Sequence, residues 1–358
     1  MKRLLSGAAL LALMVTNHPS FGQASKEESV TYERIRIIPL ESYKYKKSPS
    51  LSFPLQGIDV VVNVWDTTRL GFVQVGAMNK KIGAAFDTAM HAALQRFTDN
   101  QYKNFYTPEG KRMLWVVNEL RINERTSFTS ERAYLYLNAV SYLEGEGGQY
   151  KSLVRIDTVL ERGGLDVTKK HDEHIGEALH LLFTESAANI PGGDALSREA
   201  VIAKEAARYD LPILNDRVLN KGVYTSFKEF KNNTPSVTNF TVKEKKGKLT
   251  VYQIIAEGKE VALEKVWGLC SDNELYKLLF GDLIPLERVG KGFVIADYLE
   301  SINRRHKAIF WSGILGGALG AGIAAGSHKV YEVTALPYIK YNRPEATCIN
   351  LNNGTLSF

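Results

Sequence analysis

Residues 132–143 read RAYLYLNAVSYL, and this stretch decides the fold predicted for the first half of the chain. Small and aliphatic side chains alternate in it with tyrosines: Ala133, Leu135, Leu137 and Ala139 against Tyr134, Tyr136 and Tyr142. A period of two predicts a β-strand with one face in a core. Because the segments on either side carry the same alternation, we expect a sheet built outward from this strand.

The two neighbouring segments, residues 112–122 and 150–160, are the expected partners of that strand. In the first, one face is predicted to carry Leu114, Val116, Leu120 and Ile122, with Asn118 as the exception. In the second, apolar positions alternate with charged ones, at Val154, Ile156 and Leu160 against Lys151, Arg155 and Asp157. Gly145, Gly147 and Gly148 favour a turn between the second and third strands. Three consecutive antiparallel strands follow.

Helical periodicity flanks these strands. Residues 82–105 and 169–189 repeat apolar side chains at intervals of three and four, and the second run stops at Pro191-Gly192-Gly193. Residues 32–40 and 58–65, rich in Ile and Val, are further strand candidates. The predicted class is therefore α+β, with an antiparallel sheet and helices packed on one face, in a domain over residues 23–193.

The pattern changes after a helical connector at residues 194–221, where Ser197 is the expected N-cap. Turn signals recur every 8 to 14 residues or so across 222–300, which predicts a mainly-β domain curled into a small barrel or half-barrel. A short helix should open that domain at Ser226, where Glu229 completes a capping box. Residues 327–358 are expected to form a C-terminal β tail, with a strand at 329–341 and a hairpin at 349–358.

Residues 308–326, AIFWSGILGGALGAGIAAG, carry no formal charge over 19 positions. This length and composition predict a transmembrane or membrane-inserted helix, with membrane lipid as a partner. Its small residues, Gly313, Gly316, Gly317 and Gly320, suit close packing against a partner helix or a second copy, and Trp311 suits an interfacial anchor. The alternative is a buried, glycine-rich hairpin of a soluble domain, because glycine disfavours helices and promotes bends.

The charges around this segment argue against an ordinary anchor of the inner membrane. Arg304, Arg305 and Lys307 precede it, on the side that export would place outside, and only Lys329 follows soon after. The segment is therefore predicted to lie in an outer membrane or to dip into a bilayer without crossing it. A disulfide between Cys270 and Cys348 would exclude a simple crossing, since the two cysteines flank the segment.

Residues 1–22 have the pattern of a secretory signal peptide. Lys2 and Arg3 precede an apolar run at 4–15, and small residues stand before Gln23. The net charge is +6 for the whole chain, with 45 basic and 39 acidic residues spread along it. A balance this mild gives no concentrated basic patch, so no nucleic-acid partner is expected. Two cysteines do not make a disulfide framework.

The densest group of possible metal ligands is HDEH at 171–174, with Glu177 after it. His174 and Glu177 stand three apart on a predicted helix and could share an ion with His171. The group also opens that helix, where acidic residues are favoured by the helix dipole without any metal. HDEH is not the HExxH pattern of zinc peptidases. No phosphate-binding loop, nucleophile elbow or dinucleotide fingerprint is placed between a strand and a helix, so no catalytic residue and no cofactor are assigned.

Two resemblances accompany these patterns. The order helix, antiparallel strands, helix resembles the small α+β domains of auxiliary subunits in the bacterial envelope. Trp267, Gly268 and Cys270, standing before a strand that bears Tyr276, resemble a stretch in uncharacterised exported proteins of Gram-negative bacteria. The resemblances imply an exported envelope protein of the periplasm or outer membrane, and they bring no activity and no site residues with them.

These inferences lead to a non-enzymatic cell-envelope protein, exported and membrane-associated. It would act as a binding or assembly module for another protein or an envelope polymer. The alternative is an exported metal-dependent hydrolase that uses His171, His174 and Glu177.

Overall fold

The computed structural model describes residues 35–45, 49–75, 80–126, 130–164, 166–245, 248–279, 281–295, 334–341 and 343–358. The chain divides into two units, Met1–Glu33 and Arg34–Phe358, and the fold described below belongs to the second. The predicted signal peptide at 1–22 and the glycine-rich segment at 308–326, with Trp311, Gly313, Gly316, Gly317 and Gly320, lie outside the described residues.

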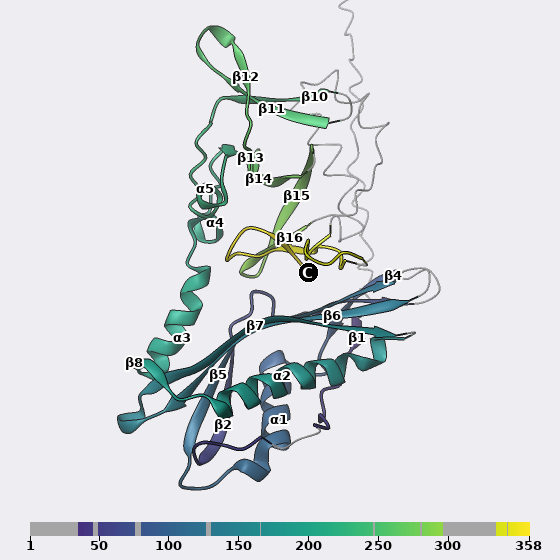
Figure 1. The fold of residues 1–358 in the computed structure, drawn as a ribbon. Coiled ribbons are helices and arrows are strands. Elements are labelled where there is room, and N and C mark those ends of the chain that lie inside the picture. The colour runs from purple at the N-terminus through teal and green to yellow at the C-terminus, as the bar shows by residue number, and fades with distance from the viewer. Residues whose placement is uncertain are drawn as a thin grey trace, which may run out of the picture. The chain divides into compact units, whose positions relative to one another are not determined.

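The three strands predicted around residues 132–143 are confirmed as the centre of an eight-stranded sheet. They are β5 (Lys111–Thr126), β6 (Glu131–Glu144) and β7 (Tyr150–Gly164), and each pairs antiparallel with the next (Figure 1). The turn before β7 uses the predicted glycines, since Gly147 and Gly148 have φ of 66° and 70°. These left-handed angles suit glycine because it has no Cβ.

Five shorter strands complete this sheet: β1 (Ile35–Ile37), β2 (Leu55–Val62), β3 (Gly71–Val75), β4 (Lys80–Ala85) and β8 (Gly192–Leu196). The sheet order is β1-β4-β3-β5-β6-β7-β8, and β2 also pairs with β5. The prediction of a purely antiparallel sheet is wrong, because β2 and β3 both run parallel to β5 and β1 runs parallel to β4. A helix lies between β4 and β5 in the chain, and such a crossover lets the strand after it run parallel to earlier ones.

The helix predicted at 82–105 is only partly right. Residues 80–85 form the strand β4, and the helix α1 covers Met90–Tyr102. Gly83 is a poor helix former, and antiparallel pairing with β3 satisfies the backbone of this segment instead. The second predicted helix is confirmed as α2 (His171–Ala188), which buries Ile175, Leu179 and Leu182.

Helices α1 and α2 lie on the same face of the sheet and form the main core with it (Figure 1). The two helices of the predicted domain thus share one face of its sheet, and the opposite face is covered by an element of the connector. Helix α3 (Arg198–Ala206), in the connector, packs Val201 against Leu114 and Val116 of that face. Its predicted N-cap is confirmed, since Ser197 Oγ accepts a hydrogen bond from the backbone N–H of Ala200 at 3.2 Å.

The register of β5 differs from the prediction at one residue. A β-bulge between Val117 and Glu119 places an extra residue, Asn118, in the strand. Leu114 and Val116 therefore face α3, whereas Leu120 and Ile122 face the helices α1 and α2. A bulge shifts the alternation by one position, which is why a single face cannot carry all four residues.

The second half of the chain contains a seven-stranded and a three-stranded sheet. The seven-stranded sheet has the order β18-β17-β16-β15-β14-β13-β9, and the other has the order β10-β11-β12. Among the described strands neither sheet closes into a barrel, because the seven-stranded meander leaves β9 and β18 as its two edges. The bounds of its first five strands are β9 (Gly222–Tyr224), β13 (Gly268–Ser271), β14 (Glu274–Leu279), β15 (Asp282–Val289) and β16 (Gly292–Ile295).

The smaller sheet consists of β10 (Phe240–Lys245), β11 (Lys248–Ile254) and β12 (Glu260–Ala262). Two short helices precede it, α4 (Pro212–Asn215) and α5 (Phe227–Lys231). The N-cap predicted for α5 is confirmed, since Ser226 Oγ accepts from the Glu229 N–H at 3.3 Å. The Glu229 carboxylate, however, accepts from the Thr225 N–H, one residue before the position that a capping box uses.

The last residues complete the seven-stranded sheet. The predicted hairpin is confirmed as β17 (Cys348–Ile349) and β18 (Leu356–Ser357), with Gly354 in its turn at a φ of 73°. Strand β17 pairs with β16, so that Val294 and Cys348 are register partners (Figure 1). The strand predicted at 329–341 is not found over 334–341, apart from one bridge at Thr334.

Candidate binding cavity

A cavity of about 340 Å³ lies between the seven-stranded sheet and the connector that leads into it. This volume falls in the range of roughly 300–1,000 Å³ that is usual for small-ligand sites. Its lining comes from the connector, from the β13–β14 turn and from strands β14 to β16: Ile213, Arg217, Leu219, Asn273, Glu274, Leu275, Pro285, Leu286, Glu287, Arg288 and Phe293.

Two hydrogen bonds join the connector to the sheet beside the cavity. Arg288 donates from its guanidinium to the carbonyl of Leu214 at 2.8 Å, and the N–H of Leu219 donates to Asn273 Oδ1 at 3.1 Å. Asn273 is placed by a two-residue hairpin turn in which Asp272 and Asn273 have φ of 52° and 62°. Turns with two positive φ angles favour Asn and Asp, as the sequence has here.

A single buried asparagine organises the outer wall. Asn233 is 1 % exposed and has a φ of 51°. Its side-chain amide donates to Asp216 Oδ2 at 2.8 Å and to the carbonyl of Val218 at 3.1 Å. Its Oδ1 accepts from the N–H of Asn220 at 2.9 Å and from the Tyr224 hydroxyl at 3.0 Å. One side chain thus defines the path of residues 216–220, which include two of the cavity's lining residues.

The chemistry of the wall is mixed. Its floor is apolar, since Ile213, Leu275, Leu286 and Phe293 all belong to a buried core. Arg217 is exposed at the rim, and the described residues offer it no ion-pair or hydrogen-bond partner. One carboxylate oxygen of Glu287 is buried, and no described residue forms a hydrogen bond with it. A ligand with an apolar group, an acceptor or negative charge, and a donor would therefore find a counterpart for each.

The predicted metal ligands are not brought together. His171 Nε2 lies 2.7 Å from Glu124 Oε1, whereas Glu177 Oε2 accepts from the Arg162 guanidinium at 2.7 and 3.2 Å. Neither ring nitrogen of His174 has a hydrogen-bond partner in the part of the chain that the structure describes. Within the described ranges, no three His, Cys, Asp or Glu side chains are grouped as a metal ion would require.

His174 is instead a core side chain at the start of α2. It is 1 % exposed, and burial lowers its pKa to about 3, with a smaller contribution from neighbouring His171. A buried imidazole avoids its charged form because that form loses its hydration. At neutral pH His174 is therefore an uncharged ring packed in the helix layer.

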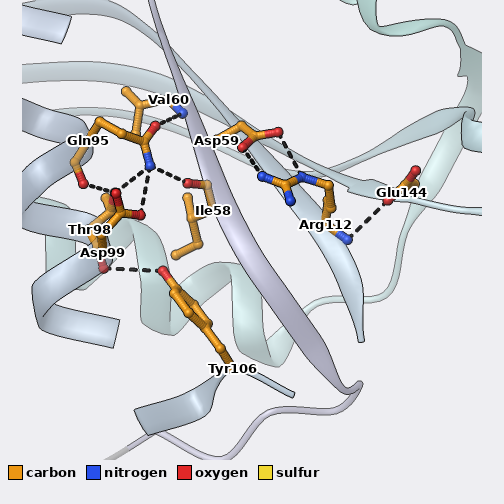
Figure 2. Close-up of polar contacts among 9 residues, drawn as sticks. All are labelled: Ile58, Asp59, Val60, Gln95, Thr98, Asp99, Tyr106, Arg112 and Glu144. Atoms are coloured by element: carbon orange, nitrogen blue, oxygen red, sulfur yellow. Dashed lines mark hydrogen bonds and ion pairs between the residues drawn. The ribbon is translucent and has the colours of Figure 1, made fainter. Parts of the chain in front are cut away.

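Figure 2 shows a second polar cluster, which seals the outer edge of strand β2. The side-chain amide of Gln95, on α1, accepts from the Val60 N–H at 2.9 Å and donates to the carbonyl of Ile58 at 2.8 Å. It thereby takes the place of a neighbouring strand. Beside it, Arg112 forms an ion pair with Asp59 across β2 and β5. Every group drawn there has a structural partner, so the cluster stabilises the sheet edge and leaves no reactive side chain free.

A third group of polar residues is buried on the α3 side of the sheet and was not predicted. Glu205 of α3, 5 % exposed, accepts from Asn118 Nδ2 at 2.8 Å and from the Tyr142 hydroxyl at 2.8 Å. Arg155 contributes two further bonds, at 2.7 and 2.9 Å. The sequence signal available for this group was Glu205, which stands on a face of α3 that otherwise carries small and apolar side chains. Alternation alone does not place that face against β5.

The two cysteines are free, and both are buried in the core beneath the cavity. Burial raises the pKa of each thiol, Cys270 and Cys348, to about 11. Thiolates are the nucleophilic form of cysteine, so these side chains are inert at neutral pH.

The membrane prediction has no counterpart inside the described ranges, where no helix reaches the length and apolarity that a bilayer crossing requires. Comparisons with known proteins found no match among protein-family models, curated proteins or solved structures.

Proposed function

We propose that this chain is a non-enzymatic binding module, exported to the cell envelope and associated with a membrane through residues 308–326. The observation that carries the binding role is the cavity beneath the connector, with its apolar floor and with Arg217 and one oxygen of Glu287, neither of which has a partner among the described residues. Those three features suit a peptide-like segment of a partner protein or envelope polymer, because such a segment has apolar side chains, carbonyl acceptors and N–H donors.

The pairing of the strands that precede and follow the apolar segment favours a segment that enters and leaves the membrane on the same side. Strands β16 and β17 lie on either side of residues 296–333 in the sequence, yet the N–H of Ile295 donates to the carbonyl of Thr347 at 2.9 Å. A single crossing would put these two strands on opposite sides of the bilayer. We therefore propose that residues 308–326 enter the membrane and leave it on the same side, which agrees with the unfavourable charge distribution for a simple crossing.

The hydrolase alternative gains no support, because Glu177 is paired with Arg162 and His171 faces Glu124. Metal analysis of the purified protein and of His174→Ala provides the direct check. Stoichiometric metal in the wild-type protein, and loss of that metal in His174→Ala, would favour the metal-dependent hydrolase instead.

Site-specific photo-crosslinking in intact cells tests the binding role. A photoreactive side chain at Val218, 72 % exposed beside the cavity, should give a discrete adduct, and Arg217→Glu should remove it. The matched control places the same group at Ile190, which is 86 % exposed away from the cavity lining. The same adducts from both positions, or an adduct that Arg217→Glu leaves unchanged, would contradict a ligand in the cavity.

A further inference from the structure

A loop at residues 334–345, described except for residue 342, follows the apolar segment in the sequence. Its base is held by the backbone bridge between Thr334 and Glu345 and by the N–H of Ala335, which donates to the carbonyl of Pro344 at 2.9 Å. The Glu345 carboxylate is itself fixed by ion pairs with Lys81 and Arg125. These contacts make the base of the loop a rigid part of the fold.

The two sides of this loop differ. Leu336 and Ile339 pack against the core, whereas Tyr338 and Tyr341 are 72 % and 68 % exposed. The other large apolar side chains that are strongly exposed in the described ranges are all aliphatic. Two outward-facing tyrosines three residues apart therefore set this loop apart from the rest of the described surface.

The loop is also cationic. Residues 334–344 contain Lys340 and Arg343 and no acidic residue. Lys340 Nζ lies 5.0 Å from the centre of the Tyr341 ring, so the charge and the aromatic side chain point to the same region. The nearest acid in sequence, Glu345, already pairs with two cations at the base. The tip thus combines two aromatic rings with the exposed ammonium of Lys340, whereas the Arg343 guanidinium donates to the carbonyl of Ile339.

This combination is what the headgroup layer of a bilayer selects. Tyrosine rings are enriched at the membrane–water interface, and lysine and arginine are attracted to anionic lipid. The end of the apolar segment at Gly326 is eight residues from Thr334, so an extended chain places them no more than about 29 Å apart. A membrane that received residues 308–326 would lie within reach of the loop.

We propose that the described part of this loop docks on the membrane surface, with Tyr338 and Tyr341 among the headgroups of anionic lipids and Lys340 against their phosphates. The docked loop orients the cavity-bearing sheet relative to the bilayer. This inference rests on the membrane association proposed above.

A fluorescent label at Tyr338→Cys tests the docking in the full chain. The exposed cysteine is labelled selectively with an environment-sensitive dye, because Cys270 and Cys348 are both buried. Phosphatidylcholine vesicles containing phosphatidylglycerol should shift the emission to the blue, and pure phosphatidylcholine vesicles should do so less. Adding Lys340→Ser, which removes one exposed charge, should lower the ratio of docked to free loop about fivefold. The same dye at Val218→Cys is the control and should not respond.

The possible results distinguish docking of the loop from membrane association through residues 308–326. The protein could co-sediment with vesicles while the dye at residue 338 shifts its emission no more than the dye at residue 218. That result would overturn the docking and leave membrane association standing. No co-sedimentation would overturn both. A shift that grows with protein concentration in the absence of vesicles would also overturn the docking, because a second copy would then be the partner.

Discussion

The two faces of the central sheet are equally buried, but they are buried by different means. Toward α1 and α2, the side chains of Trp115 and Leu137 are 0 % exposed and their neighbours are apolar. Toward α3 and the C-terminal strands, Asn118 is 0 % exposed and Arg121 is 4 % exposed. Arg121 lies over the Trp65 ring at 4.4 Å and donates to the backbone oxygen of Phe358 at 3.1 Å.

The difference shows that burial does not by itself reveal what stabilises a surface. The helix face gains its free energy from removing apolar area from water, and it tolerates any well-fitting apolar side chain. The polar face also buries apolar side chains, such as Leu114 and Val116 beneath Val201, but its stability depends in addition on the pairing of its polar groups, since each buried group left without a partner costs roughly 1–3 kcal/mol. The four predictions below test this contrast.

The largest effect is expected on the helix face. Trp115→Ala should lower the free energy of unfolding by about 4 kcal/mol, because it deletes a fully buried indole and leaves a cavity. Urea unfolding followed by circular dichroism measures the change. Trp115→Phe, which keeps a ring there, should lose much less. A loss under about 1 kcal/mol for the alanine variant would mean that this face collapses freely around the gap.

Acid should destabilise the helix face through His174. Its folded pKa is lowered from 6.5 to about 3, so the unfolded chain binds a proton more readily than the folded one. Stability is therefore full above pH 6.5 and falls as the pH decreases toward 3, by about 1.4 kcal/mol per pH unit. About 3 kcal/mol should be lost by about pH 4.5.

The pH series is measured on wild type, His174→Phe and His91→Phe. The first variant should lose this acid slope, and the second, at an exposed histidine of α1, should keep it. An unchanged slope in His174→Phe would assign the acid sensitivity to other groups.

The polar face should respond to pH in the opposite direction through Glu119. Burial raises the pKa of Glu119 from 4.5 to about 7, although Arg208 and Arg121 oppose the shift. Its contribution to stability is full below pH 4.5 and is lost as the pH rises through 7. Glu119→Gln should therefore be more stable than wild type by about 3 kcal/mol at pH 8 or so, with the difference shrinking toward about pH 5. A difference that does not vary with pH would contradict a buried, titrating carboxyl group.

The smallest loss of stability is expected at Glu205, because its partner Arg155 can be hydrated again when the carboxylate is removed. Glu205→Ala leaves Asn118 and the Tyr142 hydroxyl without an acceptor, but the Arg155 side chain is 49 % exposed and regains hydration. The loss should be about 2 kcal/mol, the lower limit for two buried groups left without an acceptor. Lys204→Ala, at the exposed neighbouring position of α3, should stay within about 0.5 kcal/mol. Equal effects of the two variants would show that the network does not hold α3.

The predictable parts of the fold were those with a strong local signal. Residues 132–143, the helix at 171–188 and the Ser197 cap were all read from periodicity and capping chemistry. The failures have physical causes at particular residues. The bulge at Asn118 depends on the partner strand β6, and residues 80–85 became a strand because β3 and β1 pair with both of their edges.

The candidate site was beyond the reach of local patterns. Its lining joins residues 213–219 of the connector to residues 273–293 of three strands, and neither segment carries a motif. The residues that were singled out, His171, His174 and Glu177, do have ligand chemistry. The fold gives two of them other partners and leaves His174 as a core side chain.

The sequence by itself determined where apolar faces form, where chain turns occur and that residues 308–326 carry no formal charge, because these depend on neighbours along the chain. Only the tertiary structure decided that β16 and β17 pair across residues 296–333, that a connector closes a cavity over the sheet, and that Glu119, Glu205 and His174 are buried. Those outcomes depend on contacts between residues far apart in the chain. The alternation of apolar and polar residues along the chain does not predict such contacts.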